Sequence, residues 1–339
     1  MLKATMLRGI LASLALAGAV LVSSQASAQT VICYSCPEEW ADWGTQLRNV
    51  KQDLGITVPI DSKNSGQAMS QIIAEKENPV ADFGYLGITF AIQAEKMGLT
   101  TPYKPKNFDD IPADLKSPDG HWFTIHAGAV GFFINKDALG NKPLPTSWKD
   151  LLKPEYKGLV GYYDPTSAFI GYVSGMAMNL ALGGTLEDFT PAMDFYKAIK
   201  ANQPIVVNQT SYARVLSGEI PILVDADFNA NRGRYKDKAN VVFVMPAEGS
   251  LPVPYAFVMT KNAPHLENAK KVADYLLSDK GQAGWANGFL RPVRPSAMSK
   301  EAADRLFPAA DYARLKKIDF GKFADAQKPF ANRYLADVR

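Results

Sequence analysis

Histidine, cysteine and long apolar runs are scarce in this chain of 339 residues. Its 3 histidines, His121, His126 and His265, show no ligand spacing, so the sequence predicts no metal site. After the N-terminal region, no stretch reaches the roughly 20 apolar residues that a membrane-spanning helix needs. An excess of one charge is also lacking, since 37 Lys and Arg residues stand against 34 Asp and Glu. This balance gives no support for nucleic-acid binding, which favours a basic patch.

The N-terminus has the pattern of a secretory signal peptide. Lys3 and Arg8 give a positive start, residues 10–22 are apolar, and the small residues 26–28 form a cleavage site. The apolar run is too short to span a bilayer. We therefore expect residues 1–28 to be removed and the mature protein to be exported into a bacterial periplasm.

The two cysteines, Cys33 and Cys36, are spaced C-x-x-C. In an oxidising compartment such a pair can form a small structural disulfide, or it can serve as the motif of a thiol oxidoreductase. Redox pairs usually open a helix, whereas Cys33 falls in an expected strand over 30–34 and Cys36 precedes Pro37 in a turn. The pattern favours a structural pair, with the exported oxidoreductase as the enzymatic alternative.

Three units of strand, polar turn and helix follow one another in the first third of the chain. Such alternation predicts an α/β fold with a parallel sheet. Ligands of these sheets bind beyond the carboxyl ends of the strands, so the three turns should lie close together. The expected strands are 30–34, 56–60 and 80–83, the helices are 40–54, 67–76 and 88–97, and the turn residues are Ser35, Asn64, Ser65, Gly66, Tyr85 and Leu86.

The stretch 159–175 repeats this arrangement in the middle of the chain. Residues 159–163 predict a buried strand, Asp164-Pro165 ends it, and Thr166 and Ser167 occupy expected N-cap positions of a helix. A helix N-terminus at a sheet edge favours an anion or a polar small molecule. An ordinary capped turn would give the same pattern.

Two extended segments, 128–134 and 253–259, have no clear helix after them and are long enough to connect two sheets. We expect two α/β lobes that close about these two crossovers as a hinge. Lobe 1 would comprise residues 29–127 and 254–339, and lobe 2 would be the inserted residues 128–253.

The chain resembles the periplasmic solute-binding proteins of ABC importers. The resemblance rests on PTSWKDLLKPEYKGLVGYYDPTSAF at 145–169, ADFGYLGITFAIQAEKMGL at 81–99 and the segment 263–295, which ends in PVRP. The group is extracellular solute-binding family 1, with iron(III)-, polyamine-, thiamine-, hexose-phosphate- and aminoethylphosphonate-binding members. The resemblance implies a type II "Venus flytrap" that has no catalytic activity and no cofactor. It implies a monomer that hands a small-molecule ligand to a membrane permease with a cytoplasmic ATPase.

The residue types favour a small anionic or zwitterionic ligand, with aminoethylphosphonate-like compounds first. Backbone N–H groups at 65–66 and 166–167 suit a phosphonate or carboxylate, Asp225 and Asp227 suit an ammonium group, and aromatic rings suit packing around it. The candidate ligand-binding residues are Ser35, Asn64, Ser65, Gly66, Tyr85, Leu86, Tyr162, Asp164, Thr166, Ser167, Asp225, Asp227, Phe228 and Tyr255.

Two other ligands of the same family remain as alternatives. A polyamine would need several carboxylates and aromatic rings. Ferric iron suits carboxylate and phenolate ligands, and iron-binding members carry two adjacent tyrosines after the strand that follows the SGE helix. Here that position holds residues 225–229, Asp-Ala-Asp-Phe-Asn, and the pair Tyr162-Tyr163 lies in an earlier strand. This departure disfavours iron.

Overall fold

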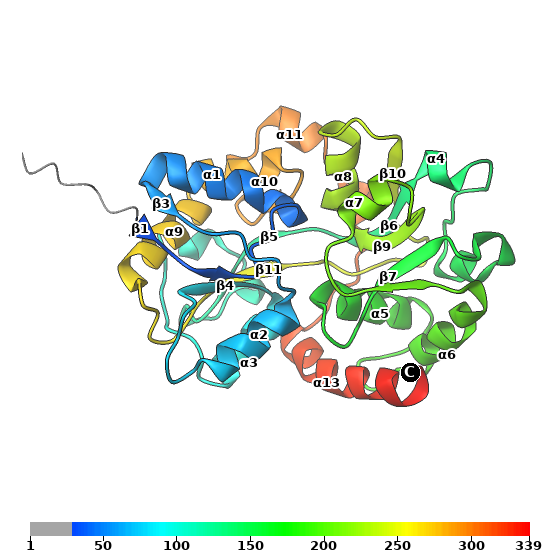
Figure 1. Ribbon diagram of the computed structural model, residues 1–339, viewed down its shortest axis with the longest axis horizontal. Helices are drawn as coiled ribbons and strands as arrows, with labels where there is room; N and C mark the ends of the chain where they lie inside the picture. Colours follow the sequence, from blue (N-terminus) through cyan, green and yellow to red (C-terminus); the bar gives the residue numbers. More distant parts are fainter. Residues whose placement is uncertain (1–28) are drawn as a thin grey trace, which may run out of the picture.

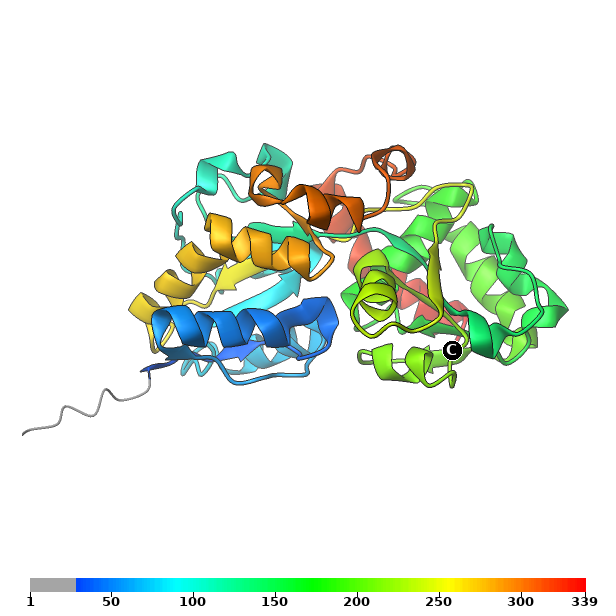
Figure 2. The same cartoon turned by 90° about the horizontal axis from the view of Figure 1, so that it is seen from above.

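Residues 29–339 are the part of the chain that the structure, a computed structural model, describes. The expected signal peptide, residues 1–28, lies outside the described residues. Two lobes lie side by side, each built around one five-stranded sheet with helices packed against it (Figures 1 and 2).

The sheet of the first lobe is mixed. Strand β2 runs parallel to β4, whereas β11 is antiparallel to both of its neighbours, β4 and β5. The predicted parallel arrangement therefore holds for β2 and β4, whereas β11, which returns from the other lobe, runs antiparallel. Strand β3 (Ile56–Thr57) instead pairs with β1 (Gln29–Thr30) in a separate parallel ribbon. The order is β12 (Arg291–Pro292), β5 (Phe123–Ala127), β11 (Tyr255–Met259), β4 (Phe83–Gly87) and β2 (Cys33–Tyr34).

Helix α1 of the first lobe buries one apolar face. In α1 the residues Trp43, Leu47 and Val50 are buried at helical spacing. The helix expected from Trp40 begins later, because Ala41 and Asp42 have left-handed backbone angles that separate a short 3-10 turn from α1. The elements are η1 (Trp40–Asp42), α1 (Trp43–Leu54), α2 (Ser65–Ala74), α3 (Ile88–Lys96), η2 (Phe108–Asp110), η3 (Ala113–Leu115), α9 (Leu266–Leu277), α10 (Asp279–Asn287), η7 (Pro295–Ala297) and α11 (Lys300–Asp304).

The second lobe surrounds a sheet whose central strands, β6, β9 and β7, are buried along their whole length. Their near-continuous apolar residues fit strands covered on both faces. The order is β10 (Val241–Val244), β6 (Val130–Asn135), β9 (Ile222–Ala226), β7 (Val160–Tyr163) and β8 (Ile205–Val207). Its helices are α4 (Lys136–Leu139), η4 (Trp148–Leu152), η5 (Pro154–Tyr156), α5 (Phe169–Ala181), α6 (Thr190–Ile199), η6 (Lys200–Asn202), α7 (Tyr212–Leu216) and α8 (Asp227–Tyr235).

The two predicted crossovers pair with each other where they pass between the lobes. Gly128 N–H donates to Val253 O at 3.2 Å, and Val253 N–H donates back to Gly128 O at 2.9 Å. A third segment, which the sequence did not predict, runs beside them: Lys316 N–H donates to Ser250 O at 2.9 Å, after α12 (Ala309–Tyr312). Three segments therefore connect the lobes.

Helix α13 (Phe320–Asp337) packs under the second lobe, where it is drawn in red in Figure 1. Phe330 contacts the rings of Tyr172 and Phe189, and Tyr334 contacts that of Tyr196, all on α5, α6 or the residue before α6. The opposite face of α13 contacts α3 of the first lobe, where Gln93 Nε2 donates to Gln327 Oε1 and Lys96 Nζ lies 2.5 Å from Asp325 Oδ1. Helix α13 therefore contacts both lobes, and the division into 29–127 with 254–339 and 128–253 remains a proposal. None of the helices in 29–339 combines the length and the apolar character needed to cross a membrane.

Candidate ligand-binding cleft

A narrow cleft lies between the lobes, and we call it the inner cleft. Both lobes contribute to its lining, but of the three turns predicted in the first lobe the one with Tyr85 and Leu86 lies within β4 and is not among the lining residues. Of the predicted residues, Ser35, Asn64, Ser65 and Tyr255 line it. The full lining is Ser35, Pro37, Trp40, Ser62, Lys63, Asn64, Ser65, Tyr163, Ala168, Phe169, Ile170, Asn208, Gln209, Thr210 and Tyr255.

The N-terminus of α5 opens into the inner cleft without a capping side chain. Its N-cap is Ala168, not Thr166 or Ser167 as predicted, and Ala168, Phe169 and Ile170 all line the cleft. The first N–H groups of a helix have no acceptor within the helix. These donors and the positive end of the helix dipole therefore face the cleft, an arrangement that favours a negative group.

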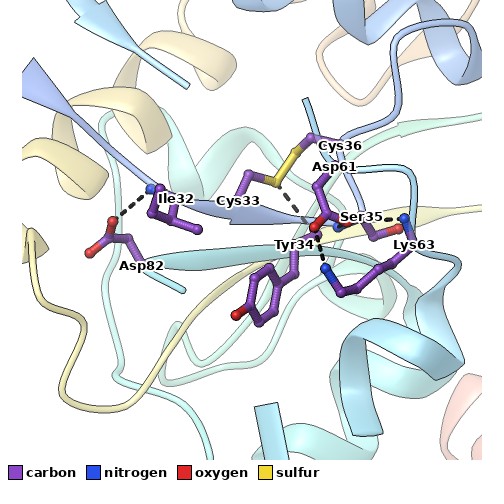
Figure 3. Close-up of a disulfide and its surroundings, with 8 residues drawn as sticks. All are labelled: Ile32, Cys33, Tyr34, Ser35, Cys36, Asp61, Lys63 and Asp82. Atoms are coloured by element: carbon purple, nitrogen blue, oxygen red, sulfur yellow. Dashed lines mark hydrogen bonds and ion pairs between the residues drawn. A yellow bond between two sulfur atoms is a disulfide. The ribbon is translucent and has the colours of Figure 1, made fainter. Parts of the chain in front are cut away.

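The opposite wall of the cleft is held by one carboxylate, Asp61. Its Oδ1 accepts from the N–H of Ser35 at 3.1 Å and from that of Lys63 at 3.0 Å, and its Oδ2 lies 2.5 Å from Lys63 Nζ (Figure 3). Lys63 is the one charged side chain in the lining, and Asp61 offsets part of its charge. Helix α2 begins just beyond, at Ser65, and the side chain of its N-cap Asn64 forms a capping box with Gln67.

The two cysteines form a disulfide that closes the turn carrying Ser35 (Figure 3). Ser35 has a left-handed backbone, with φ of 67°, and Asp61 N–H donates to Cys36 O at 3.2 Å, so the turn is tied to the neighbouring loop. Cys33 is 1% exposed and Cys36 is 0% exposed. Exchange needs a thiolate to reach a disulfide sulfur, so this burial favours the structural interpretation over the oxidoreductase.

Four aromatic rings form the floor of the inner cleft. Trp40 lies 6.2 Å from Tyr163 and 5.8 Å from Tyr255, and Phe169 lies 5.3 Å from Tyr255 between ring centroids. Each of the four is at most 5% exposed, so the lobes are closed on one another. The edges and faces of these rings suit an apolar or cationic group.

Three predicted residues lie one layer behind these rings. Tyr85 stacks on Tyr255 at 4.6 Å and its hydroxyl lies 2.8 Å from His126 Nε2, while Phe228 contacts Trp40 at 5.2 Å. Leu86 is fully buried in the core. Burial lowers the pKa of His126 to about 3, so its ring is neutral at physiological pH. These residues support the cleft and do not line it.

Asp225 lies beneath the cleft as a buried carboxylate without a cation. It is fully buried, and it accepts from Ala226 N–H at 2.7 Å and from Asn229 Nδ2 at 3.1 Å, while no ion pair within residues 29–339 includes it. Burial raises the pKa of Asp225 to about 7, although these two donors and the Tyr163 hydroxyl act to lower it. Burial, and then the Asp225 charge, raise the pKa of Tyr163 and Tyr255, the rings that separate Asp225 from the cleft.

Asp227, the other predicted carboxylate, faces the hinge. Its Oδ1 accepts from Ala129 N–H at 2.9 Å, and its Oδ2 accepts from the Tyr312 hydroxyl on the third crossing segment. Burial raises the pKa of Asp227 to about 7, and Arg291 lowers it. Asp227 is therefore placed to join hinge segments and not to contact a ligand.

The remaining predicted residues flank the inner cleft. Tyr162 points away from it, with its hydroxyl 3.1 Å from that of Tyr334, and Asp164 accepts from Thr166 N–H at 2.8 Å. Thr166 and Ser167 line an adjoining hollow that we call the outer groove. Its lining is Lys63, Gly66, Gln67, Met69, Ser70, Gln71, Phe90, Thr166, Ser167 and Gln209.

Direct hydrogen bonds join the lobes at the rim of the inner cleft. Gly66 N–H donates to Ser167 O at 3.1 Å, and Asn64 Nδ2 donates to Asn208 O at 2.9 Å. Farther along, Lys236 Nζ lies 2.8 Å from Asp42 Oδ1. These contacts define a closed arrangement in which a ligand would be enclosed.

Sequence reasoning did not select several lining residues. The sequence analysis selected Tyr162 and not its neighbour Tyr163. Adjacent residues of a strand point to opposite faces of the sheet, but the sequence does not show which of the two faces the cleft. Residues 208–210, Asn-Gln-Thr, form a polar turn after a strand, the same signal that selected 64–66. Trp40 Nε1 and Thr210 Oγ1 are buried and have no hydrogen-bond partner among the described residues, so both remain available to a ligand.

Two lobes, a paired hinge and an enclosed cleft between strand-end turns define a hinge-closing binding protein. The profile of the bacterial extracellular solute-binding protein family matches residues 78–323, so the chain belongs to this family, as the sequence predicted. Such periplasmic binding proteins of ABC importers bind small solutes and work with a membrane permease.

Three known proteins illustrate this relationship. A protein of Haemophilus influenzae, named only as uncharacterized, is 30% identical over 96% of this chain and 95% of its own. A putative 2-aminoethylphosphonate-binding periplasmic protein of Salmonella typhimurium is 26% identical over 74% of each chain. The structure of AfuA from Actinobacillus pleuropneumoniae, with fructose-6-phosphate bound, has a TM-score of 0.79 and 23% identity over 92% of this chain and 99% of its own. The predicted two-lobed type II fold is confirmed.

Replacing Gly66 with alanine should hinder closure. A Cβ at Gly66 would lie 2.3 Å from Ser167 O, so the lobes must separate by more than a side-chain adjustment. We expect the affinity for a bound solute to fall at least about tenfold, or ~1.4 kcal/mol. Small-angle scattering should show the radius of gyration shrinking with solute in the wild type and less in Gly66→Ala. Ser70→Ala on the same helix is the control, and full closure of Gly66→Ala would contradict the closed arrangement.

Removing the disulfide should destabilise the protein without abolishing solute binding. The loop between Cys33 and Cys36 is short, so loop entropy gives a loss of about 2 kcal/mol for Cys33→Ser with Cys36→Ser. Urea unfolding measures this loss, and calorimetry measures binding. Thiol–disulfide exchange activity in the wild type, absent from the double variant, would instead support the oxidoreductase.

Proposed function

We propose that this protein is the periplasmic solute-binding component of an ABC importer for a small zwitterion, with 2-aminoethylphosphonate-like compounds first. The observation that carries the proposal is the opposite polarity of the two parts of one enclosed cleft. One part presents free N–H groups at Phe169 and Ile170, and the other covers a buried carboxylate, Asp225, with aromatic rings.

The anionic end of the solute would bind between the α5 N-terminus and the loop at 62–65. Backbone N–H groups and a helix dipole favour a phosphonate or carboxylate there. Lys63 adds a cation on a rigid loop, and Asn208, Gln209 and Thr210 add polar groups from the second lobe. A ligand that contacts both walls would stabilise the closed arrangement, because it gains these contacts only when the lobes meet.

The amine of the solute would bind over the aromatic floor. A buried carboxylate is costly unless a positive partner compensates it, and Asp225 has none among residues 29–339. The rings of Trp40, Tyr163 and Tyr255 can contact an ammonium group directly. The Tyr163 hydroxyl, which favours the ionised form of Asp225, would connect the ammonium group to that charge.

The alternatives need groups that the inner cleft does not supply. A polyamine needs several carboxylates, yet no Asp or Glu is among the residues that line the inner cleft. Ferric iron suits carboxylate and phenolate ligands, but no carboxylate is among the described residues that line the inner cleft, and burial raises the pKa of Tyr163 and Tyr255, which disfavours their phenolate forms. The curated relative named for 2-aminoethylphosphonate also supports the zwitterion.

Asp225→Asn should discriminate between 2-aminoethylphosphonate and ethylphosphonate. Loss of the carboxylate should weaken binding of the amine by about 10- to 100-fold, or roughly 1.4–2.8 kcal/mol, since a buried charge attracts a nearby ammonium group strongly in a medium of low dielectric constant. Binding of ethylphosphonate should change little. Isothermal titration calorimetry gives both constants. Asp227→Asn is a matched control, because Asp227 is equally buried but faces the hinge.

Equal losses for the two ligands in Asp225→Asn would contradict an ammonium site over Asp225. Failure of the wild type to bind either phosphonate would remove the proposed solute class. A thermal-shift screen of amino acids, polyamines and sugar phosphates would then identify another class, since ligand at 100 times its dissociation constant stabilises by about 2.7 kcal/mol.

The affinity for 2-aminoethylphosphonate should rise between pH 6 and pH 8. Burial in the closed arrangement raises the pKa of Asp225 to about 7, and a bound ammonium group favours the ionised carboxylate and lowers that pKa. Binding therefore releases a proton below pH 7, and affinity increases as pH rises through this value. Asp225→Asn should show a smaller increase, which isolates Asp225 from ionisation of the phosphonate itself. Identical pH profiles in both proteins would contradict this linkage.

A further inference from the structure

The last described residue, Arg339, contacts the turn that follows β7. Its Nη2 lies 2.5 Å from Asp164 Oδ2, while Asp164 Oδ1 accepts from the N–H of Thr166 at 2.8 Å and from its hydroxyl at 2.6 Å. The Asp164 side chain is only 5% exposed and the Arg339 side chain is 51% exposed. The Asp164 carboxylate thus binds Thr166 through Oδ1 and Arg339 through Oδ2.

Arg339 is brought to this turn by buried contacts of α13 with the second lobe. The Tyr334 hydroxyl meets that of Tyr162 at 3.1 Å, in the strand that leads into the turn. Tyr172 OH donates to Phe323 O at 2.7 Å, and Lys200 Nζ donates to Val338 O. The approach of Arg339 to Asp164 is therefore set by the packing of the helix and not by a free surface chain.

The same turn carries a contact between the lobes. Ser167, next to Thr166, accepts through its carbonyl from Gly66 N–H in the first lobe at 3.1 Å. Thr166 and Ser167 also line the outer groove. The shape of residues 164–167 therefore decides whether the rim of the cleft can close as observed.

We propose that Arg339 is a positioning residue for this turn. Its guanidinium compensates the buried Asp164 carboxylate, so Asp164 can hold the Thr166 N–H and keep Ser167 O aimed at Gly66. An exposed ion pair contributes little, but a carboxylate that is almost buried is costly when its partner is removed. The effect on solute binding rests on the proposed function, whereas the effect on the turn does not.

Hydrogen–deuterium exchange of the ligand-free protein tests the effect on the turn. In Arg339→Ala the Thr166 amide should exchange roughly tenfold faster, because a charged hydrogen bond loses its support. Arg339→Lys should restore part of the protection. Arg333→Ala is the matched control, since Arg333 lies on α13 and pairs with Asp337, away from the turn. Amides of β6 report whether the whole protein has been destabilised.

A double-mutant cycle separates the charge from the packing of the segment. Asp164→Asn keeps an oxygen for Thr166 but removes the charge, so adding Arg339→Ala to it should change exchange little. Equal protection of Thr166 in wild type and Arg339→Ala would overturn the proposal, as would an equal effect of Arg333→Ala. An effect of Arg339→Ala that persists in full in the Asp164→Asn background would also overturn it.

Calorimetry with 2-aminoethylphosphonate adds the binding readout. Arg339→Ala should weaken this affinity by roughly three- to tenfold through the turn, and Arg333→Ala should leave it unchanged. If the wild type does not bind this probe, the proposed function fails, and the exchange data still decide the role of Arg339. If the probe binds equally to both proteins while Thr166 exchanges faster in Arg339→Ala, the turn is positioned by Arg339 but does not govern binding, and that half of the proposal fails.

Discussion

The reciprocal hydrogen bonds between Gly128 and Val253 are the constraint on which the arrangement of this protein depends. They join the two strands that cross between the lobes, so the strand-end turns of both sheets face one cleft. Asp227 and Tyr312 tie a third segment to the same point. Closure can therefore occur only by rotation about this cluster, and the same surfaces meet each time the lobes close.

Closure also accounts for the electrostatics of the cleft. When the lobes meet, the rings of Trp40, Tyr163 and Tyr255 exclude water from the region above Asp225. The Asp225 carboxylate then has no positive partner among residues 29–339. The resulting cost is offset when a cationic group enters. The helix N-terminus on the other wall instead favours a negative group. A zwitterion places a positive group near Asp225 and a negative group at the helix N-terminus, whereas a simple anion leaves the charge of Asp225 uncompensated.

Much of this organisation could be predicted from the sequence because the signals are local. An apolar strand followed by a polar turn marks a sheet edge wherever it occurs, and this pattern located residues 64–65 in the inner cleft and 166–167 in the outer groove. Strand direction is not local, so the antiparallel β11 was missed. Alternation also could not say whether Tyr162 or Tyr163 faces inward, since both rings are buried by aromatic neighbours.

The position of α13 shows most clearly why the rest could not be predicted. Its aromatic residues give an ordinary amphipathic pattern, which requires a partner surface but does not name it. In the structure that surface is α5 and α6, while Gln327 and Asp325 on another face contact Gln93 and Lys96 of α3 in the first lobe. Gln327 is only 8% exposed, so the contact with α3 is partly buried as well. Helix α13 thus contacts both lobes, so opening must break one of these two sets of contacts, and the sequence of α13 indicates neither partner surface.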